Sequence, residues 1–219
     1  MRKPVCNRRG RVEVVRRLQA PERLPQYAFS LLELLCLMAI LLILFVLYWK
    51  GFASRGSGPS QEAACMDNLQ KIYVAMQIYA GDNHGKFPDA PGARTSEEPL
   101  DLLVPRYTAD SSLFRCPASK NLPPLTGQSL RANRISYAVW SGRNSNEGHA
   151  PLLADELIDT LPKSVGQPAF STTGKPPGSN HGDKGGNVLF GDGEVVWSAP
   201  AIGFALPQSA GVTLLNPKQ

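Results

Sequence analysis

The sequence has few residues of the kinds that perform catalysis. Its 219 residues include three histidines, His84, His149 and His181, and it lacks the Gly-x-Ser-x-Gly, His-Glu-x-x-His and phosphate-loop spacings. A histidine and a few aspartates among glycines are more typical of turns, because Asp and Asn side chains bond to their own backbone. We therefore predict that the chain is not an enzyme.

Excess positive charge is absent beyond residue 28. Residues 1–28 carry eight Arg or Lys against two Glu, a net charge of +6, whereas the whole chain is +5. The remainder therefore sums to −1, so a nucleic-acid partner is not predicted. Lys/Arg-rich segments beside an apolar helix stay in the cytoplasm, which predicts a cytoplasmic N-terminus with the bulk of the chain outside.

One long apolar run is present. Leu34 to Tyr48 is an unbroken stretch of 15 apolar residues, and only Ser30 and Glu33 interrupt the 23 residues from Tyr27 to Trp49. As a helix, such a segment reaches roughly 34 Å, enough to cross a bilayer core of about 30 Å. A carboxylate within it is costly, so Glu33 is expected to have a partner or a role.

Three interpretations of this N-terminus are open. One is a permanent signal anchor, and another is a secretory signal cleaved after Gly51-Phe52-Ala53. The third starts from Ala28-Phe29-Ser30-Leu31-Leu32-Glu33, which resembles the class III signal of type IV pilins and type II secretion pseudopilins. A generic signal peptide gives no reason for the acid, whereas this resemblance does.

The resemblance implies a structural role in a filament. A prepilin peptidase would cut between Ala28 and Phe29 and methylate the new amine of Phe29. Glu33 would pair with that amine on a neighbouring subunit, in a core where the low dielectric strengthens the pair. The implied partners are the peptidase, an assembly platform and other copies, which pack through their N-terminal helices. The alternative is a bitopic membrane protein that does not polymerise and whose outer domain binds a ligand.

Further blocks resemble a sub-family of pilin-like proteins common in planctomycete- and verrucomicrobia-type genomes. They are Cys65–Ile72, Tyr79–Pro88, Leu113–Pro117 and a C-terminal block that runs from His181 to Asp192-Gly193. The family pattern for the last block is His-x9-Asp-Gly, and here ten residues separate the histidine from the aspartate.

The four cysteines fit this layout. Cys6 would lie in the cytoplasm, Cys36 in the bilayer, and Cys65 and Cys116 outside, where disulfides persist. A Cys65–Cys116 bridge would stabilise the fold by about 4 kcal/mol on the chain-entropy model. Two buried free thiols are the alternative.

No cofactor is expected, although a calcium site is the one metal hypothesis. Some major pseudopilins bind calcium in their C-terminal loops, and calcium prefers carboxylate and carbonyl oxygens. The candidate ligands are Asp155, Asp183 and Asp192, for which ordinary turns are the favoured alternative.

The expected organisation has four parts: a basic cytoplasmic leader (1–28), a transmembrane helix (29–50), a Gly/Pro/Ser linker (51–60) and an extracytoplasmic pilin-like domain (61–219). The chain would sit in the inner (cytoplasmic) membrane with a single pass and its C-terminal domain in the periplasm or outside the cell.

Within the last part, apolar residues spaced by three or four predict a helix up to Ala80. Residues 134–140 and 152–155 predict strands, and residues 187–197 predict a hairpin around Asp192-Gly193. Residues 89–131 and 164–186 predict loops. The predicted fold class is α+β and pilin-like. One long N-terminal helix spans the membrane with its first half and packs its outer half on a small antiparallel sheet of about three or four strands.

Overall fold

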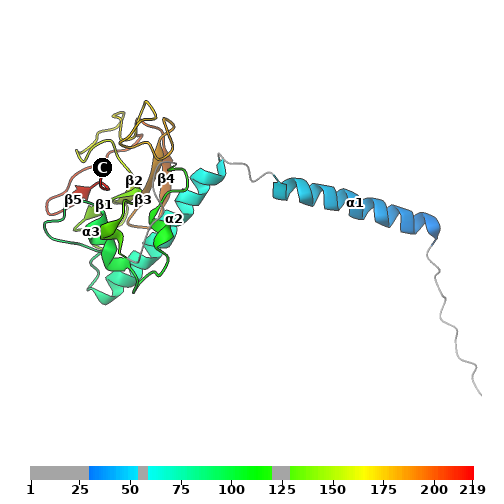
Figure 1. Ribbon diagram of the computed structural model, residues 1–219, viewed down its shortest axis with the longest axis horizontal. Helices are drawn as coiled ribbons and strands as arrows, with labels where there is room; N and C mark the ends of the chain where they lie inside the picture. Colours follow the sequence, from blue (N-terminus) through cyan, green and yellow to red (C-terminus); the bar gives the residue numbers. More distant parts are fainter. Residues whose placement is uncertain (1–29, 54–58, 120–128) are drawn as a thin grey trace, which may run out of the picture. The chain divides into compact units, whose positions relative to one another are not determined.

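The computed structural model describes residues 30–53, 59–119 and 129–219, and for residues 46–53 and 59–60 it describes the backbone alone. The chain divides into two units, residues 1–54 and 55–219. Helix α1 (Leu31–Ala53) belongs to the first unit and the other described elements to the second (Figure 1).

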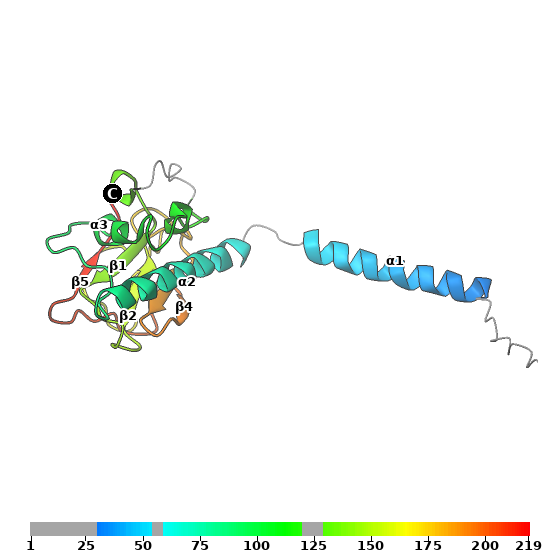
Figure 2. The ribbon, with the colours of Figure 1, turned by 90° about the horizontal axis from the view of Figure 1, so that it is seen from below.

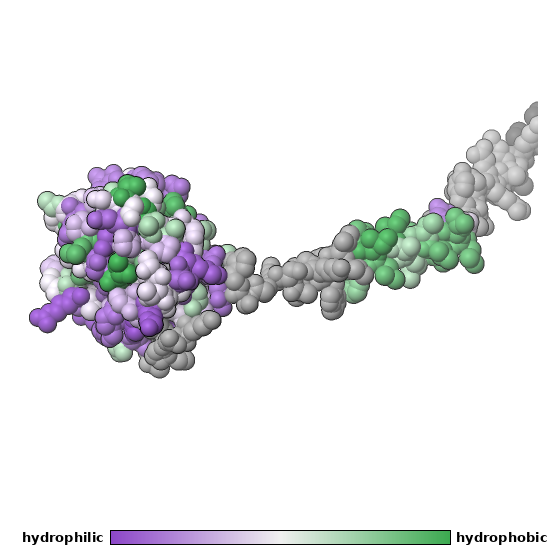
Figure 3. Space-filling model, turned by 90° about the horizontal axis from the view of Figure 1, so that it is seen from above, coloured by the Kyte–Doolittle hydropathy of each residue, from purple (hydrophilic) through white to green (hydrophobic). Residues whose placement is uncertain are grey.

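Helix α1 begins at a serine cap. The backbone N–H of Glu33 donates to the carbonyl of Ser30 at 3.0 Å and to its Oγ at 3.2 Å, which satisfies a donor that the first turn leaves open. The large apolar side chains from Leu31 to Phe45 are 49–82% exposed, and Figure 3 shows them as an apolar surface. In the described part of the chain, none of the helices combines the length and the apolarity that crossing a lipid bilayer requires.

Helix α2 (Pro59–Asp82) carries the apolar face that the spacing predicts. It starts at a proline, whose missing N–H costs nothing in the first turn of a helix. Leu69, Ile72 and Met76 are fully buried on one side. Val74 and Ile78 lie on the opposite side and are more than half exposed.

The sheet has five antiparallel strands in the order β4-β3-β2-β1-β5. Their bounds are β1 (Tyr137–Ser141), β2 (Pro151–Asp155), β3 (Gly186–Phe190), β4 (Val195–Ser198) and β5 (Thr213–Leu215). The predicted hairpin is present as β3–β4, in which Asn187 pairs with Trp197 and Leu189 with Val195. Its turn residue Gly193 has φ +90°, a conformation that glycine adopts without strain.

Both faces of the central strands are covered. Because side chains alternate along a strand, Val139, Leu153 and Leu189 pack in one apolar cluster with residues of α2. Figure 2 shows α2 lying across one face of the sheet. Trp140 and Phe190 belong to a second cluster on the opposite face. This explains why β1, β2 and β3 are buried at every position.

Long connections contribute to both clusters. Residues 89–131, predicted as a loop, include α3 (Glu97–Leu100), the 3₁₀ helices η1 (Asp101–Leu103) and η2 (Ser111–Phe114), and the start of η3 (Leu130–Ala132). Residues 164–186 were expected to form a surface loop. They instead supply Ala169 and Phe170 to the second cluster, both at most 1% exposed. A Cβ on Gly186 would overlap the Phe170 ring, so this glycine lets the loop lie directly on the sheet.

The predicted fold class is wrong as stated. A single long helix does not run from the apolar segment onto the sheet, because α1 ends at Ala53 in the first unit and α2 starts anew at Pro59 in the second. The physical reason is the composition of residues 51–60, in which glycines and a proline disfavour a continuous helix. The sheet also has five strands instead of three or four, since the chain's end supplies β5.

Candidate functional site

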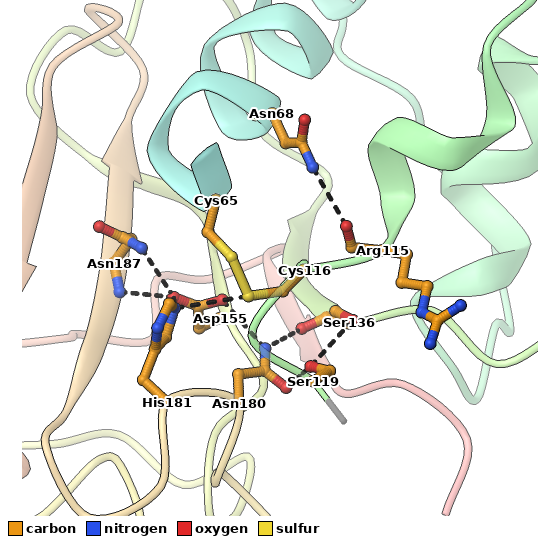
Figure 4. The surroundings of a disulfide bond; sticks show 10 residues. All are labelled: Cys65, Asn68, Arg115, Cys116, Ser119, Ser136, Asp155, Asn180, His181 and Asn187. Carbon is orange, nitrogen blue, oxygen red and sulfur yellow. Dashed lines mark hydrogen bonds and ion pairs between the residues drawn. A yellow bond between two sulfur atoms is a disulfide. The ribbon is translucent and has the colours of Figure 1, made fainter. Parts of the chain in front are cut away.

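The second unit contains a buried disulfide between α2 and the segment that follows η2. Cys65 lies near the start of α2 and is joined to Cys116, as expected from the sequence, and both residues are fully buried. A hydrogen bond from Asn68 Nδ2 to the Arg115 carbonyl (3.1 Å) links the same two segments (Figure 4). The bridge therefore fixes the N-terminal end of α2 to a loop that the helix periodicity alone does not place.

A histidine and an aspartate lie against this disulfide. His181 Nε2 is 3.2 Å from Asp155 Oδ2 and 3.5 Å from Cys116 Sγ (Figure 4). The side chains of His181 and Asp155 are 2% and 1% exposed. The imidazole also makes a T-shaped contact with Trp197, with ring centroids 5.1 Å apart at an interplanar angle of 84°. The sulfur, nitrogen and oxygen atoms thus meet in a buried site.

Asn180 and Asn187 hold the aspartate in place. The carboxylate accepts from Asn180 Nδ2 at 2.9 Å, from the backbone N–H of Asn187 at 2.7 Å and from Asn187 Nδ2 at 3.0 Å. Asn180 Nδ2 also donates to the Ser136 carbonyl, and its Oδ1 accepts from Ser119 Oγ. Since a buried carboxylate is costly without partners, this network orients Asp155 and stabilises it at the end of β2.

The Tyr137 hydroxyl is affected by the same aspartate. Burial raises the pKa of Tyr137 well above its ordinary value of 10.0, and the negative charge of Asp155 raises it further, while a contact with Asn68 opposes the shift. The phenol therefore stays protonated beside the carboxylate.

A second cluster lies at the surface, at the β3–β4 turn. His149 Nδ1 is 2.9 Å from Asp192 Oδ2 and 3.6 Å from Glu194 Oε2. The imidazole stacks on Phe190 at 4.0 Å, with 8° between the ring planes. The pKa of Asp192 is lowered, first by the backbone N–H of Glu194 and then by His149. All three ionisable side chains of this cluster are exposed.

The structure separates His181 and Asp192, the two ends of the C-terminal block described in the sequence. His181 bonds to Asp155, whereas Asp192 bonds to His149, so the two ends of the C-terminal block belong to different clusters. The calcium candidates do not form one site, because Asp155 and Asp192 lie in separate clusters and Asp183 is exposed and in neither.

Other predicted site residues lie in the first unit. Glu33 is exposed in the first turn of α1, and Ala28 and Phe29 lie outside the described residues.

Sequence reasoning did not find Asn180 and Asn187. Asparagines near glycines are typical of turns, and their convergence on Asp155 depends on strand pairing.

Two groups of side chains offer metal-ligating atoms within 4.8 Å of one another in the described residues. One is the buried set Cys65, Cys116, Asp155 and His181, and the other is the exposed set His149, Asp192 and Glu194. Comparisons with protein-family models, with curated proteins and with solved structures found no match to this chain.

Proposed function

We propose that the protein is a structural subunit of a filament related to type IV pili or type II secretion pseudopili. A prepilin peptidase cleaves it between Ala28 and Phe29 and methylates Phe29. The subunit is inserted in the cytoplasmic membrane before assembly, and it assembles with other copies through its N-terminal helix. The proposal rests on the signal-like sequence from Ala28 to Glu33 and on the surface of α1.

The observation that carries the proposal is the apolar character of α1 on all sides. Twelve large apolar side chains between Leu31 and Phe45 are 49–82% exposed, and none of these residues is in either apolar cluster of the second unit. Covering one side chain of this size stabilises by about 1.5–3 kcal/mol. A helix that is apolar all round is normally buried, so lipid or other copies of the helix are the coverings that fit.

Glu33 supports assembly over simple anchoring. It is the one acid in a described stretch of apolar side chains, and its backbone N–H is already satisfied by Ser30. The carboxylate itself gains nothing from an apolar environment, because a buried charge needs a partner. The methylated amine of Phe29 in a neighbouring copy supplies that partner in the proposed filament.

Replacing the acid tests the proposal. Glu33→Gln keeps the size of the side chain and removes the charge, so filament assembly should be lost while membrane insertion and the second unit are unchanged. The matched control is Asp67→Asn, which removes an exposed acid that pairs with Lys71 on α2. The measurements are sedimentation and electron microscopy of sheared surface material, with membrane fractionation of the same cells.

The two outcomes separate the two classes of protein. Assembly by the control but not by Glu33→Gln supports a filament subunit. If both variants fractionate with the membrane and the wild type forms no polymer under any condition that expresses the assembly platform, the protein is a bitopic membrane protein that does not polymerise.

A further inference from the structure

We propose that reduction of the Cys65–Cys116 disulfide creates a binding site for a tetrahedral divalent cation such as Zn²⁺. The ligands are the two freed thiolates, His181 Nε2 and a carboxylate oxygen of Asp155. This inference is independent of the proposed filament function, since it concerns the second unit alone.

The donor set matches the chemistry of zinc. Thiolate sulfur, imidazole nitrogen and carboxylate oxygen are the three ligand types that Zn²⁺ takes from proteins, usually four at a time in structural sites. All four side chains are buried, and their ligand atoms lie within 4.8 Å of one another. The exposed group around His149 offers three ligands and no sulfur, so it fits such a site less well.

Two of the ligand separations already have the required length. With Zn–S of about 2.3 Å and Zn–N and Zn–O of about 2.0–2.2 Å, tetrahedral geometry separates sulfur from nitrogen by about 3.5 Å and nitrogen from oxygen by about 3.4 Å. The structure has 3.5 Å between Cys116 Sγ and His181 Nε2, and 3.2 Å between His181 Nε2 and Asp155 Oδ2. Once the S–S bond is broken, the two sulfurs must separate to about 3.8 Å, and the other pairs of ligand atoms start from separations within 4.8 Å.

Residues behind the ligands hold two of them in position. Asn180 and Asn187 donate to the Asp155 carboxylate, which is the role that hydrogen-bond partners of metal ligands usually play. The His181 ring is set by its edge contact with Trp197. The cation would also supply positive charge to the buried Asp155 carboxylate, which forms an ion pair with His181 among the described residues.

The site lies close to the protein surface on the loop side. The whole His181 residue is 8% exposed, and the adjacent Asp183 and Lys184 are exposed, so solvent lies within two or three residues of the site. Pro117, next to Cys116, is exposed as well.

The chemical step is a two-electron reduction. A dithiol such as dithiothreitol gives two electrons and two protons to the S–S bond, which becomes two thiols while the dithiol closes to its own disulfide. Binding of the cation then releases the thiol protons, because thiolates are the ligands. His181 coordinates through an unprotonated Nε2 and keeps its proton on Nδ1.

Cobalt absorption tests the site directly. The probe is Co²⁺ alone, added to the full chain in detergent with Cys6 and Cys36 replaced by Ser, so that Cys65 and Cys116 are the only sulfur donors among cysteines. After reduction and removal of the dithiol without oxygen, we expect one equivalent to bind, with thiolate-to-cobalt charge-transfer bands and the visible bands of tetrahedral Co²⁺. The oxidised protein should show neither.

Three variants in the same background identify the ligands. His181→Ala should abolish the tetrahedral spectrum, and Asn180→Ala, which disturbs the support of Asp155, should weaken binding by about 10- to 100-fold. His149→Ala is the control at the exposed cluster and should bind like the parent. Near-ultraviolet circular dichroism follows the fold in each case.

Other results would overturn the proposal. One such result is that the reduced parent protein, whether folded or unfolded, shows no thiolate-to-cobalt charge-transfer bands. Another is that the parent and His181→Ala bind Co²⁺ equally well. Loss of binding only in His149→Ala would assign the cation to the exposed cluster instead.

Discussion

Removal of the Cys65–Cys116 disulfide should destabilise the second unit by about 4 kcal/mol. The two cysteines are 51 residues apart in sequence, and the chain-entropy model gives a loss of about 14 cal/mol/K for a loop of this length. At 25 °C this corresponds to about 4 kcal/mol of unfolding free energy. Cys65→Ala/Cys116→Ala is the suitable variant, because both residues are fully buried and alanine adds no polar group.

The expected shift in melting temperature follows from the size of the unit. Residues 55–219 form it, and at about 2.1 cal/mol/K per residue the unfolding entropy is about 0.35 kcal/mol/K. A loss of 4 kcal/mol therefore lowers Tm by about 12 °C. The assay is thermal unfolding of the full chain in detergent, followed by near-ultraviolet circular dichroism.

Cys36→Ala is the matched control. Cys36 is an exposed, free cysteine in α1, so its removal should leave the Tm of the second unit unchanged. A double alanine variant that melts within about 2 °C of the wild type would refute the reasoning, because the cross-link would then contribute nothing to the entropy of the unfolded chain.

Four further predictions use local features of the second unit. Gly185→Ala should prevent stable folding, since φ is +117° and an added Cβ would overlap the Ser198 carbonyl. Gly81→Ala in α2 should instead raise the unfolding free energy by about 0.5–1 kcal/mol, because an added Cβ there meets no atom within 4 Å. Urea titration measures both effects. Tyr137→Phe should flatten the fall in stability above pH 10, because the raised folded-state pKa lets the unfolded chain lose this proton first. Asp155→Asn should lower the unfolding free energy by about 1–3 kcal/mol in a urea titration, because it places an amide group among hydrogen-bond donors that the carboxylate now accepts from.

Elements that depend on local pattern were predicted well. Apolar residues at spacings of three and four located the buried face of α2, and Leu69, Ile72 and Met76 lie there. The Asp-Gly turn between two β-prone runs located the β3–β4 hairpin.

Elements that depend on long-range pairing were missed. Strand β5 has three residues, and it becomes a strand because Leu215 pairs with Val139, far away in sequence. Propensity over so short a segment carries little information. Residues 164–186 were predicted as a loop, yet Ala169 and Phe170 in this segment pack in the apolar cluster on the second face of the sheet.

The candidate site likewise contains one feature that the sequence predicted and one that it did not. The disulfide was expected from the separation of the cysteines between compartments. The contact between His181 and Asp155 was not expected, because it requires the end of β2 and the loop before β3 to be neighbours. Adjacent strands create that proximity, and no local motif encodes it.

Mass spectrometry of the N-terminus of the mature protein tests the central claim most directly. The filament account predicts that the first residue is Phe29 and that its amine carries a methyl group. An intact leader that begins at Met1, or a chain that starts at Ser54 beyond the apolar segment, would contradict it.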